Sequence, residues 1–290
     1  YGIMRSYVKG IDAVSPTGEP LSLGGKLIKN NTGYDLMHLI IGSEGTLAVI
    51  TRVVLRLYSQ PGATATMVIP YDNRHHAVDT VPRILQSGIT PLAIEYIERS
   101  VIELAAAHLG SAWPCRAGTA HLMLIVEGSN REEVHTHCAR IVELATEYHA
   151  LEAIIGETRR EQETVLKIRS NIYTAMKRRV ADVLDITVPP ADTGKLMDAI
   201  DSMAGRFGTT IPICGHVGDG NVHPHLMKDL IEDTGQRLKA IKVEIYQATV
   251  KLGGSLTGEH GVGKIRTPDL DIFKNPAELE LMRAIKAVFD

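Results

Sequence analysis

A glycine-rich stretch between two histidines constrains the fold of this chain more than any other feature. It reads Gly215-His216-Val217-Gly218-Asp219-Gly220-Asn221-Val222-His223-Pro224. The residues before it, 209–214, are β-branched and apolar, so we expect a strand that ends near His216. Residues 218–221 are turn formers that reverse the backbone. The return run should then bring His223 beside His216.

A second motif follows about 35 residues later, as Gly258-Glu259-His260-Gly261-Val262-Gly263. Consecutive residues of an extended chain point to opposite sides, so Glu259 and His260 can hardly both bind one ion. One is expected to bind and the other to remain beside the site. A neutral imidazole suits a general base, because its pKa lies near working pH. Each piece alone also fits a core histidine or an ordinary turn; together they indicate a divalent metal site.

A third segment joins these two motifs in a family resemblance. It comprises Lys29-Asn30-Asn31-Thr32-Gly33-Tyr34-Asp35-Leu36, then Ile41-Gly42-Ser43-Glu44-Gly45-Thr46-Leu47 and Ile50-Thr51. The three segments, in this order, resemble the FAD-linked oxidases of the vanillyl-alcohol oxidase/p-cresol methylhydroxylase (PCMH) superfamily. The similar branch holds D-lactate dehydrogenase (cytochrome), the glycolate oxidase flavin subunit and D-2-hydroxyglutarate dehydrogenase.

The expected fold class is α+β, in two parts. The resemblance implies that residues 1–58 are the C-terminal part of a PCMH-type FAD-binding domain. Residues 62–290 would be the substrate domain, a ferredoxin-like antiparallel-sheet cap with helices on one side, and the linker is Ser59-Gln60-Pro61-Gly62. In that part we expect strands at 66–70, 91–97, 120–127, 184–188 and 209–214, and helices at 75–86, 100–109, 131–148, 160–180, 193–204 and 233–251.

The resemblance places FAD at the first part of the chain. Glycines 42 and 45 let the backbone approach a flat ring or a diphosphate. The implied cofactor contacts are Tyr1, Gly2, Gly42, Ser43, Glu44, Gly45 and Ile50. The family's glycine-rich diphosphate loop, which lies upstream of the Tyr-Gly pair, has no counterpart in this chain. We therefore expect a piece of a longer flavoenzyme that holds FAD poorly by itself.

The resemblance also divides the site residues into roles. It implies metal ligation by His216, His223 and Glu259, with His260 as the base. Zinc is the first choice for two nitrogens and one oxygen, with manganese or iron as alternatives.

The implied substrate contacts are Arg169, Asn221 and His225. Arg169 sits beside the predicted buried stripe of helix 160–180 and would grip a carboxylate. His225 stands where relatives often carry Asn, and Val183 replaces a lysine that meets a second carboxylate in the D-2-hydroxyglutarate branch. Without that cation a second carboxylate would lie unpaired, so D-lactate or glycolate is favoured.

The expected activity is oxidation of a D-2-hydroxy acid to the 2-oxo acid, with hydride passing to flavin N5. Electrons would leave to a cytochrome, a quinone, an electron-transfer flavoprotein or an iron–sulfur subunit. A metal-dependent hydrolase and a non-catalytic cap fragment stay open as alternatives. The formal charge of −3 gives the chain no net positive charge that would attract nucleic acid. No apolar run reaches the roughly 18 residues needed to span a membrane. We expect a cytoplasmic protein, with a peripheral place at the membrane open through its acceptor.

Three cysteines without a CxxC pair favour a reducing compartment and buried, structural roles. Cys115, Cys138 and Cys214 also lack the spacing of an iron–sulfur centre.

Overall fold

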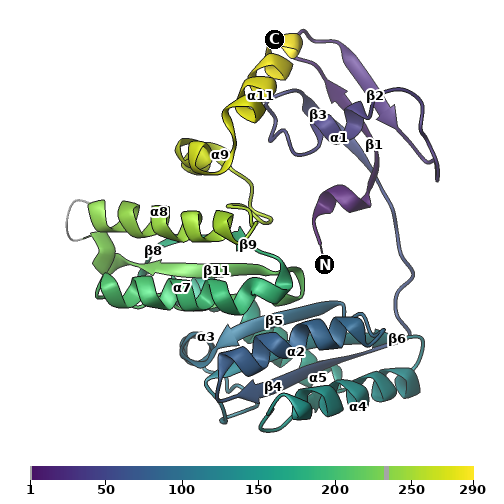
Figure 1. The fold of residues 1–290 in the computed structure, drawn as a ribbon. Helices are drawn as coiled ribbons and strands as arrows, with labels where there is room; N and C mark the ends of the chain where they lie inside the picture. The colour runs from purple at the N-terminus through teal and green to yellow at the C-terminus, as the bar shows by residue number, and fades with distance from the viewer. Residues whose placement is uncertain (1, 232–234) are drawn as a thin grey trace. The chain divides into compact units, whose positions relative to one another are not determined.

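The computed structural model describes residues 2–231 and 235–290 of the chain (Figure 1). It divides into two compact units. The first combines Tyr1–Gln60 with Glu259–Asp290, and the second is Pro61–Gly258. The junction at Gln60 and Pro61 falls inside the linker expected from the sequence. The grouping of residues 259–290 with the first unit differs from the single division expected there.

The first unit is built on a three-stranded antiparallel sheet in the order β2-β1-β3. A turn closed by hydrogen bonds between Ser15 and Glu19 joins β1 to β2. The elements of this unit are η1 (Met4–Tyr7), β1 (Val8–Val14), β2 (Pro20–Gly24), α1 (Leu36–Ile40), β3 (Val49–Leu55), α9 (Gly263–Arg266), η5 (Thr267–Asp269), α10 (Leu270–Phe273) and α11 (Pro276–Phe289).

A small apolar cluster holds this unit together. Val8, Ile11 and Ala13 of β1 are buried with residues of the α1 region, and Phe289 of α11 packs against them. The last helix of the chain therefore completes a core that the first strand begins. In contrast, most side chains of β3 are exposed, including Val49 and Val53.

The second unit contains an eight-stranded antiparallel sheet in the order β7-β4-β6-β5-β10-β11-β8, with β9 also paired to β11. Its strands are β4 (Ala63–Tyr71), β5 (Ala93–Glu98), β6 (Ala120–Gly128), β7 (Ile154–Gly156), β8 (Val180–Val183), β9 (Ile186–Thr187), β10 (Ile213–His216) and β11 (Asn221–Met227). Its α-helices are α2 (Arg74–Gln86), α3 (Arg99–Leu109), α4 (Arg131–Glu147), α5 (Arg159–Ser170), α6 (Ile172–Met176), α7 (Thr193–Arg206) and α8 (Gln236–Lys251), and its 3-10 turns are η2 (Pro190–Asp192), η3 (Val217–Asp219) and η4 (Lys228–Ile231).

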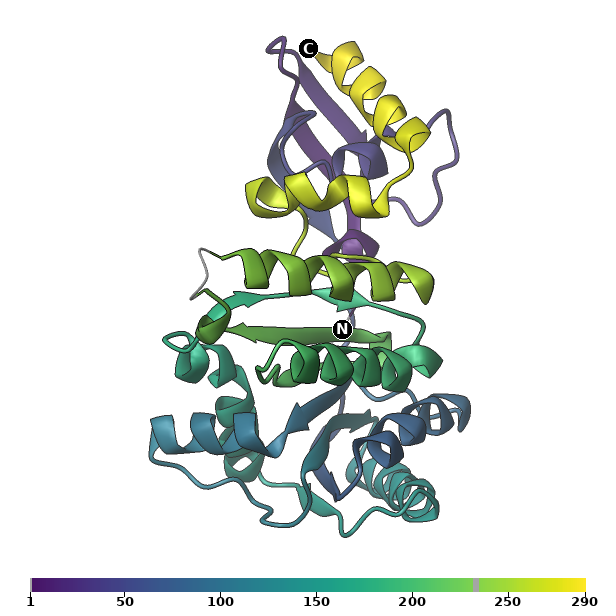
Figure 2. The same ribbon diagram turned by 60° about the vertical axis from the view of Figure 1, so that its left-hand side comes forward.

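Helices cover both faces of this sheet, whereas helices on one side were expected from the sequence. Alternate strand residues such as Ile97 and Met123 pack against α3, α5 and α6. Helices α2 and α4 pack on the other face, and Figure 2 shows α2 and α3 on opposite sides of the strands. The mixed helix and antiparallel sheet architecture itself is the one expected.

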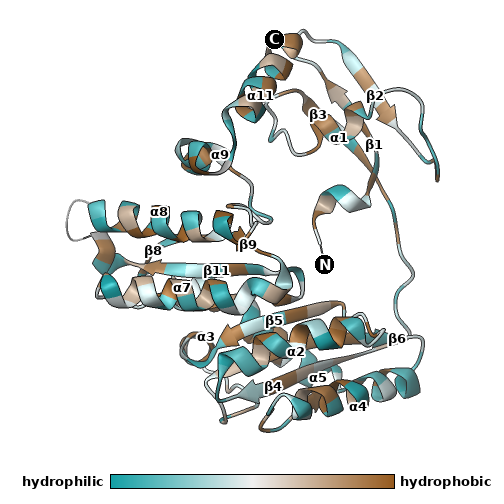
Figure 3. Cartoon of the chain, viewed as in Figure 1, coloured by the Kyte–Doolittle hydropathy of each residue, from teal (hydrophilic) through white to brown (hydrophobic). Residues whose placement is uncertain are grey.

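The helices of this unit are amphipathic, as the hydropathy colouring in Figure 3 shows. In α2 the buried positions Ala77, Val78, Val81 and Ile84 follow helical spacing. Asn73 begins this helix by accepting a hydrogen bond from the His75 N–H. Burial of one stripe against the sheet thus fixes the helix face, and the cap fixes its start.

The helix predicted over 160–180 is interrupted at Asn171 and ends at Met176. Helix α5 ends at Ser170, α6 ends at Met176, and Val180 already begins β8. The Asn171 side chain donates to the Lys167 carbonyl at 2.9 Å, which is typical of a side chain that ends a helix. Pairing of β8 with β11 then outweighs the helical pattern of the sequence.

Other element boundaries shift by a few residues. The strand expected over 209–214 starts at Ile213, and that expected over 184–188 is reduced to Ile186–Thr187. Helix α8 starts at Gln236, and the start predicted at Asp233 lies outside the described residues. All three cysteines are buried and free, as expected. Among the described residues, no helix is both long and apolar enough to cross a membrane.

Candidate active site

The turn between β10 and β11 brings two histidines together, and this confirms the local structure expected from the sequence. His216 pairs with Asn221 in the antiparallel ladder, and Cys214 pairs with His223. The rings of His216 and His223 meet edge to face, with centroids 5.2 Å apart. Each offers a ring nitrogen, and these nitrogens lie within 4.8 Å of one another. Such a pair can bind one metal ion.

Glycine is required at the end of this turn. Gly220 has a φ of 71°, and a Cβ there would lie 2.0 Å from the Val188 carbonyl oxygen. Both the left-handed backbone and the close approach exclude a larger residue without movement of the chain. The tight turn between β10 and β11 therefore requires a residue without a side chain at position 220.

A buried glutamate, Glu95, lies beside this pair. It shares a sheet face with His216, because Cys214 is paired with Ile97 and side chains alternate along each strand. Its Oε1 lies 2.6 Å from Nδ1 of His216. Its Oε2 accepts hydrogen bonds from Nε and Nη2 of Arg169 at 3.0 and 2.6 Å. One carboxylate thus joins strands β5 and β10 to helix α5.

The partners of Glu95 keep it charged. Burial by itself raises the pKa of its carboxyl, but the His216 hydrogen bond and the Arg169 charge outweigh burial, and the pKa lies below its usual range. Arg169 follows the buried Ile168 on α5, as the predicted stripe implied.

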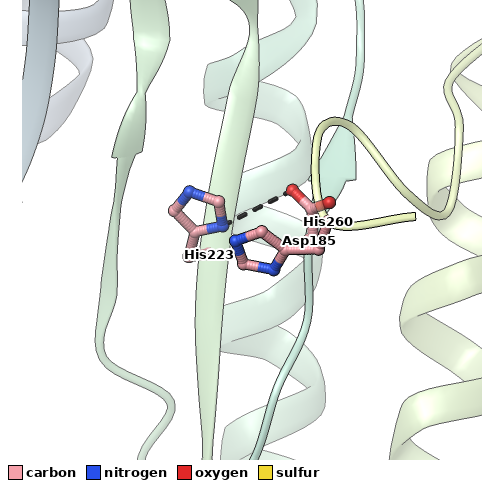
Figure 4. A group of neighbouring side chains, drawn as sticks. All are labelled: Asp185, His223 and His260. Carbon is pink, nitrogen blue, oxygen red and sulfur yellow. Dashed lines mark ion pairs between the residues drawn. The ribbon is translucent and has the colours of Figure 1, made fainter. Parts of the chain in front are cut away.

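Asp185 and Asn221 form a second buried polar group on the other side of His223. The Asp185 carboxylate lies 3.6 Å from Nδ1 of His223, marked by the dashed line in Figure 4. The Asn221 amide donates to Asp185 at 2.9 Å, to the Ile186 carbonyl at 3.0 Å and to the Thr187 hydroxyl at 3.1 Å. Asn221, expected to contact substrate, therefore has a clear structural role in holding the loop.

His225, the other residue expected to contact substrate from this strand, is buried. Its Nδ1 lies 3.2 Å from the Pro212 carbonyl oxygen. Burial lowers the pKa of its ring, so the side chain is neutral. It lies on the same face of β11 as His223, two residues away.

Glu259 and His260 directly follow the anchored end of the second unit. The Gly258 N–H donates to the Asp185 carbonyl at 2.8 Å, and Thr257 forms a bridge with Asp185. A Cβ on Gly258 would lie 2.4 Å from the Asn221 amide nitrogen. Figure 4 draws His260, the second residue after Gly258, with Asp185 and His223. The chain thus leaves this unit immediately next to the residues that pack around His223.

The segment expected to contact flavin lies in the first unit, except that Tyr1 falls outside the described residues. Gly42 and Gly45 have φ values of 90° and 76°, as a close backbone approach requires. The Glu44 carboxylate accepts the backbone N–H groups of Val262 and Gly263, both at 2.6 Å. Glu44 therefore fastens this loop to the segment that follows His260.

Three of the residues expected to contact flavin could contact a ligand, two because they are exposed and one because its hydroxyl makes no hydrogen bond to a described residue. Gly2 and Ile50 are exposed. The Ser43 hydroxyl is buried and makes no hydrogen bond to any described residue. Strand β3 pairs on one edge, with β1, among the described strands. Main-chain groups on its other edge suit contacts to the rim of a flat cofactor.

The residues present fit both a divalent metal and a flavin. Two imidazole nitrogens set close together are a donor set that zinc and its neighbours accept. Left-handed glycines, together with a buried hydroxyl that bonds to no described residue and a strand edge, are consistent with flavin contacts.

Two members of this site were not predicted from the sequence. Glu95 is a charged residue inside the apolar run Ala93–Ile97, and a buried charge in a strand is the signal that could have indicated it. Asp185 is the first residue of the stretch Asp-Ile-Thr-Val-Pro, and the composition of that stretch alone does not indicate a role for Asp185. Its link to His223 depends on the pairing of β9 with β11, which sequence spacing does not specify.

Comparison with known proteins shows the family to which the chain belongs. The family "FAD linked oxidases, C-terminal domain" matches residues 60–290. The chain is 34% identical to D-lactate dehydrogenase of Archaeoglobus fulgidus, over 100% of this chain and 63% of that protein. It is 30% identical to glycolate oxidase subunit GlcD of Bacillus subtilis, over 100% of this chain and 62% of that protein. The chain thus spans a little under two thirds of the length of these relatives.

More distant similarity is found both to another sequence and to solved structures. By sequence, the chain is 27% identical to D-2-hydroxyglutarate dehydrogenase of Stutzerimonas stutzeri, over 100% of this chain and 64% of that protein. The structure of p-cresol methylhydroxylase with substrate bound matches 98% of this chain and 63% of its own, with a TM-score of 0.74 and 14% identity. That likeness concerns the fold alone. By its sequence and its fold, this chain belongs to the family of FAD linked oxidases and contains their C-terminal domain.

Proposed function

We propose that this chain is the substrate-binding part of a flavoenzyme that oxidises a D-2-hydroxy acid to the 2-oxo acid. The observation that carries the proposal is the grouping of His216 and His223 with Glu95 and Arg169 on one face of strands β5, β10 and β11. A pair of metal-binding imidazoles beside a carboxylate-binding guanidinium matches the two oxygen functions of a 2-hydroxy acid. Relatives named for D-lactate, glycolate and D-2-hydroxyglutarate support the same class.

In the proposed site, His216, His223 and Glu259 would hold a divalent metal, with zinc as the first choice. Glu259 is assigned from the sequence, because it is the residue directly after the anchored Gly258. A metal held there would supply polarisation of the substrate hydroxyl, and FAD, when bound, would supply the acceptor for the hydride from C2. Gly2, Gly42, Ser43, Glu44, Gly45 and Ile50 are the described residues proposed to contact the flavin, together with Tyr1.

Two side chains of this chain act on the substrate directly. Arg169 binds the carboxylate and orients C2, because a guanidinium offers five N–H groups in a fixed plane. His260 takes the hydroxyl proton as a neutral imidazole. His225, on the same strand face as His223, is retained as a substrate contact, and Asn221 supports the loop that carries both metal-binding histidines.

The proposed substrate is a monocarboxylate such as D-lactate or glycolate. Val183 stands opposite His225 in the β8–β11 ladder and supplies no cation for a second carboxylate. The electron acceptor belongs to the proposal as a class: a cytochrome, a quinone, an electron-transfer flavoprotein or an iron–sulfur subunit. We place the enzyme in the cytoplasm or at the membrane periphery through that acceptor.

The direct test is anaerobic mixing of the full-length, flavin-loaded protein with single 2-hydroxy acids while flavin absorbance is followed. D-lactate or glycolate should bleach the flavin, and D-2-hydroxyglutarate should do so more slowly. Arg169→Met, with similar length and no charge, should raise the substrate concentration needed for half-maximal bleaching by roughly 10²-fold. Metal-dependent ester or amide hydrolysis without any bleaching would instead support a hydrolase. A flavin unchanged by every acid would support a non-catalytic cap.

A further inference from the structure

One buried carboxylate contacts both the metal-binding and the substrate-binding side chains. Glu95 Oε1 lies 2.6 Å from His216 Nδ1, and Glu95 Oε2 lies 2.6 Å from Arg169 Nη2. These residues are 121 and 74 positions away from Glu95 in the sequence, so chain proximity does not explain the contacts. A buried carboxylate is costly unless it is paired. Here both partners are residues that the proposed function uses.

We propose that Glu95 is a positioning residue that sets His216 for the metal and Arg169 for the substrate carboxylate. The inference rests on the proposed function and deepens it. When Nδ1–H of His216 donates to Glu95, the lone pair of His216 lies on Nε2, where an ion can be bound. The contacts from Nε and Nη2 fix the plane of the Arg169 guanidinium through the same carboxylate.

Only a carboxylate can serve both partners at once. His216 and Arg169 each direct an N–H group at a different oxygen of Glu95. An amide of the same size has one oxygen and one NH₂ group. In Glu95→Gln the NH₂ group, a donor, must therefore face an N–H donor of either His216 or Arg169. The volume is kept, but the two contacts can no longer form together, so neither partner is held as the carboxylate holds it. Glu95→Asp keeps both oxygens but is shorter by one methylene, so it cannot reach both partners without movement.

The test uses two readouts on the purified protein. The first is the zinc affinity of the metal-free protein, measured by competition with a chelating dye. The second is the KM for D-lactate of the full-length, flavin-loaded protein with a dye acceptor. Glu95→Gln should lower zinc affinity by about 10- to 100-fold, the usual loss for an outer partner of a metal-binding histidine. It should raise KM by roughly tenfold as the guanidinium loses its fixed plane.

Glu98→Gln is the matched control, because Glu98 lies on the same strand but, three residues on, faces the other side of the sheet. It should leave zinc affinity and KM within about twofold of wild type. If Glu95→Gln does not fold, as judged by circular dichroism, Glu95→Asp replaces it and should lower zinc affinity or raise KM by a similar factor.

Two results separate failure of this inference from failure of the proposed function. If wild-type protein binds zinc and His216→Ala abolishes that binding, but the folded Glu95 variants keep wild-type zinc affinity and KM, Glu95 has no positioning role. If wild-type protein binds no zinc through His216, the metal site itself is absent and the proposed function falls with it.

Discussion

Buried ionisable side chains in the second unit differ in whether the fold balances their charge. Glu95 is charged because His216 and Arg169 surround it. His121 has no such partner among the described residues: its Nε2 lies 3.0 Å from the Ala117 carbonyl oxygen, and its Nδ1 makes no hydrogen bond to any of them. Burial lowers the pKa of His121 to about 4. An ionisable residue inside an apolar strand thus indicates a functional site only when charged or hydrogen-bonding side chains surround it.

His121 predicts a pH dependence of stability. Its pKa in the fold, about 4, lies below its unfolded value of 6.5, so the unfolded chain binds the proton first as pH falls. Between pH 6.5 and pH 4 the free energy of unfolding should therefore drop by up to about 3 kcal/mol through this group. Urea unfolding at pH 7.5 and pH 4.5 should show a smaller drop for His121→Gln than for wild type. Equal drops would mean that His121 is protonated in the folded protein.

At the scale of elements, the β10–β11 hairpin shows what the sequence specifies well. Apolar residues before His216, turn formers at 218–221 and the return of His223 were all predicted and are all observed. Local chemistry determines such a turn. The end of the helical region at Met176 was not predictable in this way, because β8, which follows it, depends on pairing with β11. The position of Glu95 next to Arg169 depends on the packing of α5 on the sheet. This contact is also non-local, so it could not be predicted from the sequence.

Substitution of Gly220 should break the hairpin selectively. An alanine Cβ would lie 2.0 Å from the Val188 carbonyl oxygen in a left-handed backbone, so Gly220→Ala should lower stability by about 3 kcal/mol. Gly208→Ala is the matched control, since Gly208 has a φ of 61° but an alanine Cβ there would have no neighbouring atom within 4 Å. It should lose about 1 kcal/mol from backbone strain alone. Thermal unfolding of both variants checks this; equal losses would show that the close approach to Val188 has no energetic weight.

At the scale of the molecule, the first unit is assembled from both ends of the sequence. The sequence indicates one division of the chain, near residue 60, and does not reveal that residues 259–290 join the first unit. The contacts responsible are non-local: Phe289 packs on the β1 core, and Glu44 binds the backbone at 262 and 263. Hydrophobic periodicity within α11 indicates a helix but not the surface that the helix covers.

Removal of the Phe289 ring should loosen the β1 core. The ring is partly buried, so Phe289→Ala should cost that unit about 1.5 kcal/mol. Hydrogen exchange followed by mass spectrometry should then show roughly tenfold faster exchange in Val8–Val14 and unchanged exchange in Ala120–Gly128 of the second unit. Unchanged exchange in both strands would mean that α11 does not stabilise the sheet.

The central claim is that Glu259 binds the metal while its neighbour His260 moves the proton. Zinc content and turnover of the flavin-loaded protein, measured side by side for Glu259→Gln and His260→Asn, test it most directly. His260→Asn should retain zinc and lower turnover by roughly 10²-fold, the usual contribution of a positioned base. Glu259→Gln should lose zinc by more than the roughly 10- to 100-fold expected for an outer partner, and activity with it. Equal loss of zinc in both variants, or retention of zinc by Glu259→Gln, would contradict the account.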